Sequence, residues 1–402
     1  MEQRHILVAV TGGIAAYKVP ELVRLLVRAG HATRCILTPE ARHFVAPLVL
    51  QTLTGSVVRA DLFDPAEEGQ IDHIALADWA ELAIVAPATA NSLAKLAHGL
   101  ADDLVSAVAL ATRAPLLVAP AMNVNMWNHP ATRANLALLQ ERGVRVVGPE
   151  AGALACGWEG AGRMSEPSAI AAAAELALGP RSLAGEVVLV TAGGTREAVD
   201  AVRYLGNRSS GRMGFAVAAE AARRGAQVVL VAAPTSLPTP AGARRVDVES
   251  ALEMRAAVQA ELPRATVVVK AAAVADFRPA RAWAQKIRKE DLEPGAAPSL
   301  ELLANPDILA EVCQEKGRRV VVGFAAESHD LLASARRKLA RKGCDLIVAN
   351  EITGAEGAFD ADASRVSFVW PGGEVEELPR LSKAEVAAQL LDRIEKLRGG
   401  AA

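Results

Sequence analysis

Short runs of β-branched residues and leucine alternate with alanine- and leucine-rich stretches along most of the chain, and this alternation restricts the fold more than any other feature. Because these runs are almost continuously apolar, they predict strands buried on both faces, as in a parallel sheet covered by helices on each side. The first-half strands are predicted at Ile6–Val10, Thr33–Leu37, Leu82–Ala86, Leu116–Ala119 and Val144–Val147. The helices between them are predicted at Ile14–Ala29, Asn91–Leu96, Leu104–Ala111 and Pro130–Arg142.

The alternation stops at a Gly/Pro/Ser stretch, Gly179–Gly185, and then begins again. A late hairpin is predicted from the Pro-Gly-Gly turn at 371–373, which joins Val366–Trp370 to Val375–Leu378, and a last helix follows at Lys383–Leu397. A chain of 402 residues is longer than one hydrophobic core ordinarily accommodates. We therefore predict two doubly wound α/β domains, 1–183 and 184–402. The strands of the second are predicted at Val187–Thr191, Gln227–Val231, Ala265–Lys270, Val320–Phe324 and Asp345–Ala349.

Charge and composition exclude several classes of protein. The formal net charge is −2 and no basic block is present, so nucleic acid is not an expected partner. No apolar run is long enough to span a bilayer, and the first residues lack the apolar core of a signal peptide, so no membrane partner is expected. The cysteines lie far apart in the sequence and predict neither a metal pair nor a disulfide framework, which favours the reducing cytoplasm: Cys35, Cys156, Cys313 and Cys344.

Small and polar residues follow the first-half strands, at the edge where open parallel sheets bind ligands. Thr11-Gly12-Gly13-Ile14 leads from a strand into a helix, where backbone N–H groups favour a phosphate, although the dinucleotide fingerprint G-x-G-x-x-G is absent. The Leu82 strand ends in the segment PATANS, and the next strand ends in APAMNVNMW. Each of these features also has a structural interpretation instead of a ligand-binding one. The glycines would serve packing in the turn, Asn91 would cap a helix, and Met122 would belong to the core.

Two further first-half residues are suited to proton transfer. His73 precedes a predicted helix that leads into the Leu82 strand, which would let it reach the same cleft. Histidine titrates near neutral pH, although a lone histidine is more often structural or solvent-exposed. Cys156 lies in the glycine-rich stretch Gly152–Met164, where the sequence favours a mobile loop over core packing. A surface loop with an incidental cysteine is the alternative.

Four motifs in order, DHIALADWA, PATANS, APAMNVNMW and ACGWEGAGRM, make residues 5–165 resemble the flavin-dependent cysteine decarboxylases, which include phosphopantothenoylcysteine decarboxylase and lantibiotic-processing enzymes. The resemblance implies a Rossmann-like flavoprotein domain in which FMN provides the electron acceptor for decarboxylation. Cys156 is then the proton donor, His73 the base or orienting group, and Asn123 the ligand of the carboxylate. Met126 and Arg163 would hold the substrate. The implied FMN contacts are Gly12, Gly13, Ile14, Thr38, Thr89, Ala90 and Asn91.

The second half carries a different set of polar segments. Residues 200–214 place three arginines, an asparagine and two serines among glycines before a helix, a pattern typical of an anion cradle. Asp276 follows a strand, where a carboxylate can bind magnesium on phosphates. Lys338 and Lys342 are spaced to share one helix face. Ordinary solvated loops are the alternative.

The segments TAGGTRE, RSSGRMG, AAAVADFRP, KIRK, NPDI, GFAAES and K-x-x-x-K make residues 187–350 resemble phosphopantothenate–cysteine ligase, a Rossmann-like nucleotide-binding enzyme. The resemblance implies that CTP activates 4′-phosphopantothenate as an acyl-cytidylate, which cysteine then attacks. Asn207 would stabilise that intermediate with Arg203 nearby, Lys286 would serve the second step, and Asp276 would hold Mg²⁺. The other implied substrate contacts are Lys270, Ala271, Ala272, Pro306, Asp307, Ile308, Leu309, Phe324, Lys338 and Lys342.

The two halves together resemble the bacterial bifunctional coenzyme A biosynthesis proteins, in which the ligase step precedes decarboxylation. The family also implies a homo-oligomer, with trimers of the flavin domain and dimers of the ligase domain combining up to a dodecamer. Two other hypotheses remain at this point: a flavin-binding regulatory subunit, against which His73, Asn123 and Cys156 speak, and an NAD-dependent oxidoreductase, which the missing fingerprint disfavours.

Overall fold

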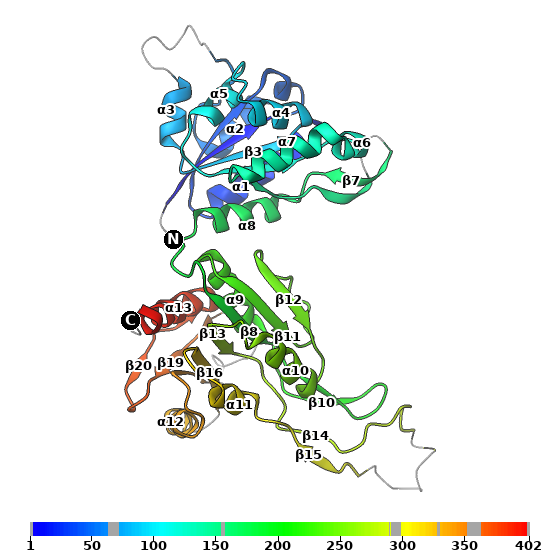
Figure 1. Cartoon of the computed structure of the whole chain (residues 1–402), viewed down its shortest axis with the longest axis vertical. Coiled ribbons are helices and arrows are strands. Elements are labelled where there is room, and N and C mark those ends of the chain that lie inside the picture. Colours follow the sequence, from blue (N-terminus) through cyan, green and yellow to red (C-terminus); the bar gives the residue numbers. More distant parts are fainter. Residues whose placement is uncertain are drawn as a thin grey trace. The chain divides into compact units, whose positions relative to one another are not determined.

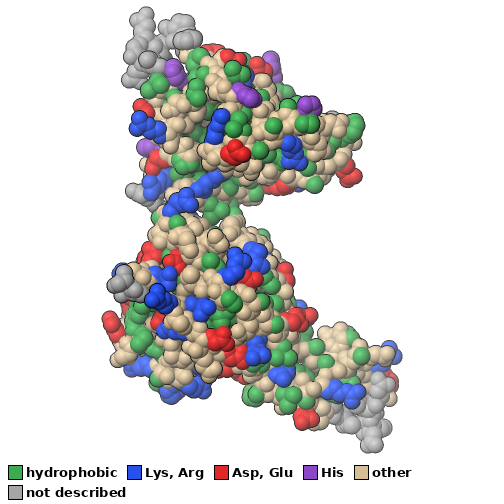
Figure 2. Space-filling view, viewed as in Figure 1, with side chains coloured by type: hydrophobic (Ala, Val, Ile, Leu, Met, Phe, Trp, Pro, Cys, Tyr) green, Lys and Arg blue, Asp and Glu red, His purple; other side chains and the backbone are tan. Residues whose placement is uncertain are grey.

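The computed structural model divides the chain into two compact units, residues 1–178 and 179–402 (Figure 1). The boundary between the units, at 178/179, lies a few residues before the predicted boundary at 183/184. The structure describes residues 3–62, 72–153, 157–288, 290, 299–327, 330–351 and 363–399. In that part of the chain no helix combines the length and apolar character needed to cross a bilayer. On the face in Figure 2, acidic and basic side chains are interspersed, in line with the near-neutral formal charge.

The first unit contains five parallel strands in the order β2-β1-β3-β4-β5. In register, Val8 of β1 lies between Cys35 of β2 and Ile84 of β3. The strands are β1 (His5–Val10), β2 (Ala32–Leu37), β3 (Leu82–Ala88), β4 (Leu116–Pro120) and β5 (Arg145–Val146). The first-half strand predictions are therefore confirmed to within a few residues.

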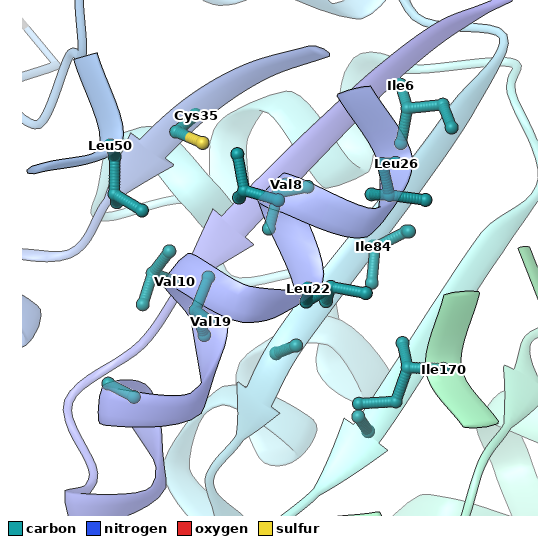
Figure 3. Close-up of a cluster of buried hydrophobic side chains, with 14 of the residues drawn as sticks. Ile6, Val8, Val10, Val19, Leu22, Leu26, Cys35, Leu50, Ile84 and Ile170 are labelled. Carbon is teal, nitrogen blue, oxygen red and sulfur yellow. The ribbon is translucent and has the colours of Figure 1, made fainter. Parts of the chain in front are cut away.

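Helices cover both faces of this sheet because its strands are apolar on both sides. On one face, Leu22 and Leu26 of α1 pack against Ile6 and Val8 of β1 and Ile84 of β3 (Figure 3). The helices of that face are α1 (Val19–Arg28), α2 (Pro47–Thr54) and α8 (Pro167–Leu178). Those contributing to the core of the other face are α3 (Asp72–Trp79), α4 (Ala90–His98), α5 (Leu104–Ala111), α6 (Val124–Asn128) and α7 (Pro130–Glu141).

Two first-half predictions hold only in part. The helix predicted at Ile14–Ala29 is a 3₁₀ turn, η1 (Ile14–Lys18), followed by α1, because Pro20 has no N–H and occupies the first turn of the α-helix. A second 3₁₀ turn, η2 (Pro39–His43), follows β2. The two ends of the glycine-rich stretch predicted as a loop lie in strands. These strands, β6 (Glu150–Ala153) and β7 (Glu159–Arg163), pair as an antiparallel hairpin. Glycines in these strands permit dihedral angles and close approaches that other residues resist.

The second unit contains an eight-stranded sheet in the order β12-β11-β8-β13-β16-β17-β19-β20. It is parallel from β12 to β17, and the last two strands are antiparallel. The strands are β8 (Val187–Ala192), β11 (Gln227–Ala232), β12 (Ala243–Asp247), β13 (Val267–Lys270), β16 (Val320–Glu327), β17 (Leu346–Glu351), β19 (Val366–Val369) and β20 (Val375–Glu377). The predicted hairpin is confirmed, whereas β12 is an additional edge strand.

Helices again lie on both sheet faces. Helices α10 (Ala251–Glu261), α11 (Ile308–Gln314) and α12 (Leu331–Lys342) contribute to one core, and α9 (Arg212–Arg223) packs with α13 (Lys383–Gly399). Short ribbons complete the unit, and the one formed by β14 and β15 projects from it in Figure 1. They are β9 (Arg196–Ala198) with β10 (Tyr204–Gly206), β14 (Phe277–Pro279) with β15 (Leu302–Ala304), and β18 (Ala363–Ser364) with β21 (Leu381–Ser382).

Candidate active sites

The first candidate site lies where the strand order of the first sheet reverses. The chain leaves β1 and β3 toward helices on opposite faces, and such switch points leave a crevice at the carboxyl ends of the strands. The Thr11 hydroxyl donates to the Pro87 carbonyl at 2.6 Å and ties the two strand ends together. A cavity of about 860 Å³ opens there, which is a size suited to a cofactor and a small substrate.

Six of the seven residues predicted to contact FMN line this cavity, whereas Ala90, the first residue of α4, does not. Thr89 caps α4 by accepting from the Ser92 N–H at 3.2 Å, so the cap predicted at Asn91 belongs to Thr89. Thr38 caps η2 in the same way. The six lining residues are Gly12, Gly13, Ile14, Thr38, Thr89 and Asn91.

The residues predicted to hold the substrate also line the cavity. Asn123 Oδ1 accepts from the Asn125 N–H at 2.8 Å, and this cap of α6 orients the Asn123 amide. Met126 is exposed and adds an apolar surface. Arg163, at the end of β7, donates to Glu150 at 2.9 Å, and its guanidinium lowers the pKa of the Glu150 carboxyl. A cation and an amide thus converge beside apolar walls.

The structure does not bring His73 to this cavity. His73 lies in the first turn of α3, and in Figure 1 α3 and β7 are at opposite sides of the unit. Cys156 lies outside the described residues, between the two strands of a hairpin that reaches the cavity through Ala153, Gly162 and Arg163. His73 is therefore not part of the cavity wall of its own chain, so the prediction that it reaches the same cleft is not met within one chain.

Lys18 lines the cavity and was not predicted. Its ammonium donates to Glu166 at 2.9 Å and to the Met164 carbonyl at 3.3 Å, so it joins η1 to the segment after the hairpin. Only 11% of its side chain is exposed. The partners are almost 150 residues apart in the sequence, and no local pattern indicates such a contact.

The second candidate site lies in the larger sheet, where the strand order 12-11-8-13-16-17 reverses between β8 and β13. A cavity of about 660 Å³ opens beyond β13 and β16. The Asn207 amide donates to the Val274 carbonyl at 3.1 Å and joins two loops of its wall. The predicted residues that line it are Asn207, Lys270, Ala271, Ala272, Asp276, Pro306, Asp307, Ile308, Leu309, Phe324, Lys338 and Lys342.

Positive charge dominates this second cavity. Lys338 donates to the Phe324 carbonyl at 2.6 Å, and Lys342 forms an ion pair with Asp307, the N-cap of α11. Arg337 and Arg341 of the same helix also line the cavity. These two arginines were not predicted as site residues. The repeat of basic residues four apart in SARRKLARK nevertheless indicates that they share a helix face.

Lys270 ends β13 inside this cavity. Loss of solvation lowers the pKa of Lys270 to about 7, and the charges of Lys338 and Lys342 act in the same direction, against a smaller opposing effect of Asp276. The ammonium is therefore lost as the pH rises through 7. A cation this poorly compensated favours a bound anion.

Arg203 and Lys286 do not line the cavity. They lie on two segments that are joined through Asp200. The buried Asp200 carboxylate accepts from Arg203 Nε at 2.8 Å and from the Ile287 N–H at 3.2 Å. Arg203 Nη2 also donates to the Ile287 carbonyl at 2.8 Å. Arg203 thus holds the segment that carries the exposed Lys286.

Among the described residues, no group of three His, Cys, Asp or Glu side chains is arranged to hold a metal ion. Asp276 is exposed on the rim of the second cavity. Mg²⁺ commonly uses one or two carboxylates together with substrate phosphates, so this single carboxylate fits a metal that arrives with a nucleotide.

The fold and the two cavities define a two-domain α/β protein with a candidate active site in each domain. Residues 1–176 match the family described as Flavoprotein, and residues 183–397 match the family described as DNA/pantothenate metabolism flavoprotein C-terminal domain. The chain belongs to the family of bifunctional coenzyme A biosynthesis proteins. It is accordingly an enzyme with a phosphopantothenoylcysteine synthetase step and a decarboxylase step.

Two relatives illustrate the similarity. The coenzyme A biosynthesis bifunctional protein CoaBC of Escherichia coli K12 is 46% identical over 390 residues, covering 96% of this chain and 95% of the relative. The CoaBC protein of Bacillus subtilis 168 is 43% identical over 401 residues, with 99% and 98% covered. The solved C-terminal domain of a CoaBC protein is 38% identical, covers 54% of this chain and 97% of its own, and has a TM-score of 0.46.

Proposed function

We propose that the second domain uses CTP and Mg²⁺ to join 4′-phosphopantothenate to cysteine, and that the first domain uses FMN to decarboxylate the product to 4′-phosphopantetheine. The observation that carries this proposal is the presence of two separate cavities at the two switch points. One has small residues, hydroxyls and methionines in its walls, and the other has a cluster of cations.

The first cavity fits FMN by size and by the chemistry of its walls. The N-terminal N–H groups of α4 and the glycine turn Gly12-Gly13 suit a phosphate, and Ile14, Met122 and Met126 suit a flat apolar ring. FMN would supply a reversible two-electron acceptor, without which an isolated cysteinyl carboxylate does not readily lose carbon dioxide, and the electrons would return to the product so that no net oxidation occurs. In our proposal the described residues bind and orient this pair.

The substrate would meet the cavity at the hairpin end. The Asn123 amide donates to its carboxylate, and Arg163 exchanges its bond with Glu150 for an anionic group of the substrate. The Cys156 thiol gives the proton that completes the product thiol. His73 orients the reacting group of a neighbouring subunit.

In the second cavity, the triphosphate would lie among Lys270, Lys338 and Lys342, and the Asp276 carboxylate would help to hold Mg²⁺. These charges stabilise the pyrophosphate that leaves when the pantothenate carboxylate attacks the α-phosphorus. Asn207 donates to the acyl-cytidylate, and Lys286, on its anchored segment, acts when the cysteine amine displaces CMP.

The direct test supplies purified protein with 4′-phosphopantothenate, cysteine, CTP and Mg²⁺. We expect pyrophosphate, CMP, carbon dioxide and 4′-phosphopantetheine, and an FMN-like absorbance in the protein itself. Omission of cysteine should stop both amide formation and decarboxylation, whereas added phosphopantothenoylcysteine should be decarboxylated without CTP. A colourless protein that cannot take up FMN would overturn the first-domain assignment.

Lys270 leads to a prediction for nucleotide binding. Because its pKa in the unliganded domain is about 7, most Lys270 is neutral at pH 8, and a bound triphosphate should reprotonate it. CTP binding above pH 7 should therefore take up close to one proton, and the dissociation constant should rise by up to about tenfold per pH unit. Calorimetry in buffers of different ionisation enthalpy measures both quantities.

Two variants control for this effect. Lys270→Met should bind CTP more weakly and lose the proton uptake between pH 7 and 9. Lys316→Met should keep it, because Lys316 is paired with Asp345 and does not line the second cavity. Proton uptake unchanged in Lys270→Met would contradict the role of Lys270. Phosphate groups with a pKa near 6 are ionised throughout this range.

The separation of His73 from the cavity of its own chain leads to a prediction about assembly. If subunits of a homo-oligomer share sites, His73→Asn and Cys156→Ser chains should each lack decarboxylase activity but complement one another when co-assembled. A random one-to-one mixture should recover about a quarter of the parental activity, since each site draws its two groups from different chains. Mixed assemblies as inactive as the separate variants would show that sites are not shared. Ligase activity reports folding in every sample.

A further inference from the structure

Cys313 and Cys344 are in contact, although they are 31 residues apart in the sequence and were not predicted to pair. The Cys313 and Cys344 thiols form a hydrogen bond with their sulfurs 3.5 Å apart, and both residues are free cysteines. Neither lies in the walls of the two cavities described above. The contact brings together the last turn of α11 and the short link between α12 and β17.

The two cysteines differ in exposure. Cys313 is partly exposed, and Cys344, although only 3% exposed, lines a third cavity of about 610 Å³ between α12 and the β19–β20 turn. The neighbouring Cys344 thiol and the charge of Lys316 lower the pKa of Cys313, whereas pairing with Cys313 and burial raise that of Cys344. Cys313 is therefore the nucleophile of the pair and Cys344 the resolving thiol.

The thiol pair is built into elements that form the second cavity. Cys313 is on α11, whose N-cap Asp307 pairs with Lys342, and Cys344 follows Lys342 by two residues. A Cβ on Gly323 would lie 3.7 Å from Cys344 Sγ, so this sulfur packs beside β16 next to Phe324, whose carbonyl binds Lys338. A covalent change at the sulfurs acts directly on the supports of two cavity lysines.

We propose that Cys313 and Cys344 form a reversible thiol–disulfide site through which a small-molecule disulfide switches off the ligase domain. The Cys313 thiolate attacks one sulfur of the disulfide RSSR and releases RS⁻, which takes up the proton lost by Cys313. The Cys344 thiolate then attacks Cys313 Sγ and releases the second RS⁻, which takes up the Cys344 proton. The protein pair is oxidised by two electrons, and RSSR is reduced to two RSH.

The size of the required movement explains why the bond would matter. A disulfide needs its sulfurs about 2 Å apart, so the present 3.5 Å contact must shorten by roughly 1.5 Å. Such a displacement at the end of α11 pulls on Asp307 and Lys342, and misplacement of about 1 Å in a reactive site can cost about 100-fold in rate. The enzyme's own substrate and product are thiols, so their disulfides belong to the class that would act here.

The experiment treats the full-length protein with oxidised glutathione, removes the reagent, and measures CTP-dependent ligation. We expect ligation to fall by roughly tenfold or more and to return after dithiothreitol. Digestion and mass spectrometry should find a peptide pair joined through Cys313 and Cys344, with the loss of two hydrogen masses. Cys313→Ser protein should ligate before treatment and lose no activity during it, although Cys35, Cys156 and Cys344 remain.

A second variant, Cys344→Ala, should form only a mixed disulfide at Cys313, which separates cross-linking from simple blocking. The inference is overturned if no Cys313–Cys344 peptide forms, if the cross-linked protein ligates as fast as the reduced protein, or if Cys313→Ser is inactivated equally. The inferred thiol–disulfide switch rests on the proposed nucleotide site, but the experiment distinguishes an error in the switch from an error in the nucleotide site. A wrong nucleotide leaves reduced protein without CTP-dependent activity, whereas a wrong switch leaves activity unaffected by the bond.

Discussion

Gly162→Ala should abolish most decarboxylation while leaving ligation intact. Gly162 of β7 has φ +155°, and a Cβ there would overlap the Met122 carbonyl oxygen. The backbone must stay close, because the Met122 N–H donates to the Gly162 carbonyl at 2.9 Å. A methyl group would push the hairpin away from α6, with which β7 is in contact (Figure 1), and would separate Arg163 from Asn123. We expect kcat for decarboxylation to fall about 100-fold.

The matched control for Gly162→Ala is Gly152→Ala, in the other strand of the same hairpin. Gly152 has φ +151°, so the backbone strain is similar, but its Cβ would come only within 3.9 Å of the Arg163 guanidinium. This variant should lose far less activity. Flavin absorbance and ligase activity should stay near parental values in both proteins, which would show that they are folded. Equal losses in the two variants would mean that strain, and not the contact with Met122, controls the hairpin.

The sequence predicted the parts of the fold that depend on local pattern. Apolar runs located nearly all the strands of the two main sheets, and Leu104–Ala111 was predicted at its observed bounds, where Asp103 caps the helix in the structure. Edge strand β12 was missed, since its sequence Ala-Arg-Arg-Val-Asp has no apolar run. The β6–β7 hairpin was missed because glycine is normally unfavourable in strands.

The candidate sites divide in the same way. Residues that follow a strand, such as Gly12 and Asp276, were predictable because parallel strands end at one edge of the sheet. Contacts between distant segments were not, and Lys18 with Glu166 and Cys313 with Cys344 are examples. They arise from the packing of elements whose sequences carry no mutual signal. The position of His73 away from the cavity belongs to the same class.

Asp200→Ala should strongly reduce ligation without preventing nucleotide binding. The Asp200 side chain is fully buried and accepts from the N–H groups of Val202 and Arg203 at 2.9 and 2.8 Å, as well as from Arg203 Nε and the Ile287 N–H. Its loss leaves these donors unpaired and releases the segment that carries Lys286. Since Lys286 serves the second step in our proposal, we expect kcat for ligation to fall about 100-fold. The CTP dissociation constant should change little, because neither Asp200 nor Lys286 lines the cavity.

The acidity of Asp200 bears on the conditions of this test. Its bond with Arg203 holds the pKa of the Asp200 carboxyl well below its usual range. Stability that comes from a lowered carboxyl pKa is present above the unfolded pKa of about 4 and is lost only as the pH falls through the folded value. The anchor is therefore intact across the neutral range, and the Asp200→Ala effect should not vary between pH 6 and 9.

Asp247→Ala is the matched control for Asp200→Ala, because Asp247 also pairs with an arginine, Arg245, but is 73% exposed. Exposed ion pairs contribute little, so this variant should ligate like the parent. Arg203→Ala should reproduce the Asp200→Ala defect, and the double variant should be no slower than either single one, as expected for residues that act as one unit. Additive losses would mean that Arg203 contacts the reacting groups itself, independently of Asp200. Loss of CTP binding in Asp200→Ala would instead show that the carboxylate supports the whole domain and is not specific to the segment that carries Lys286.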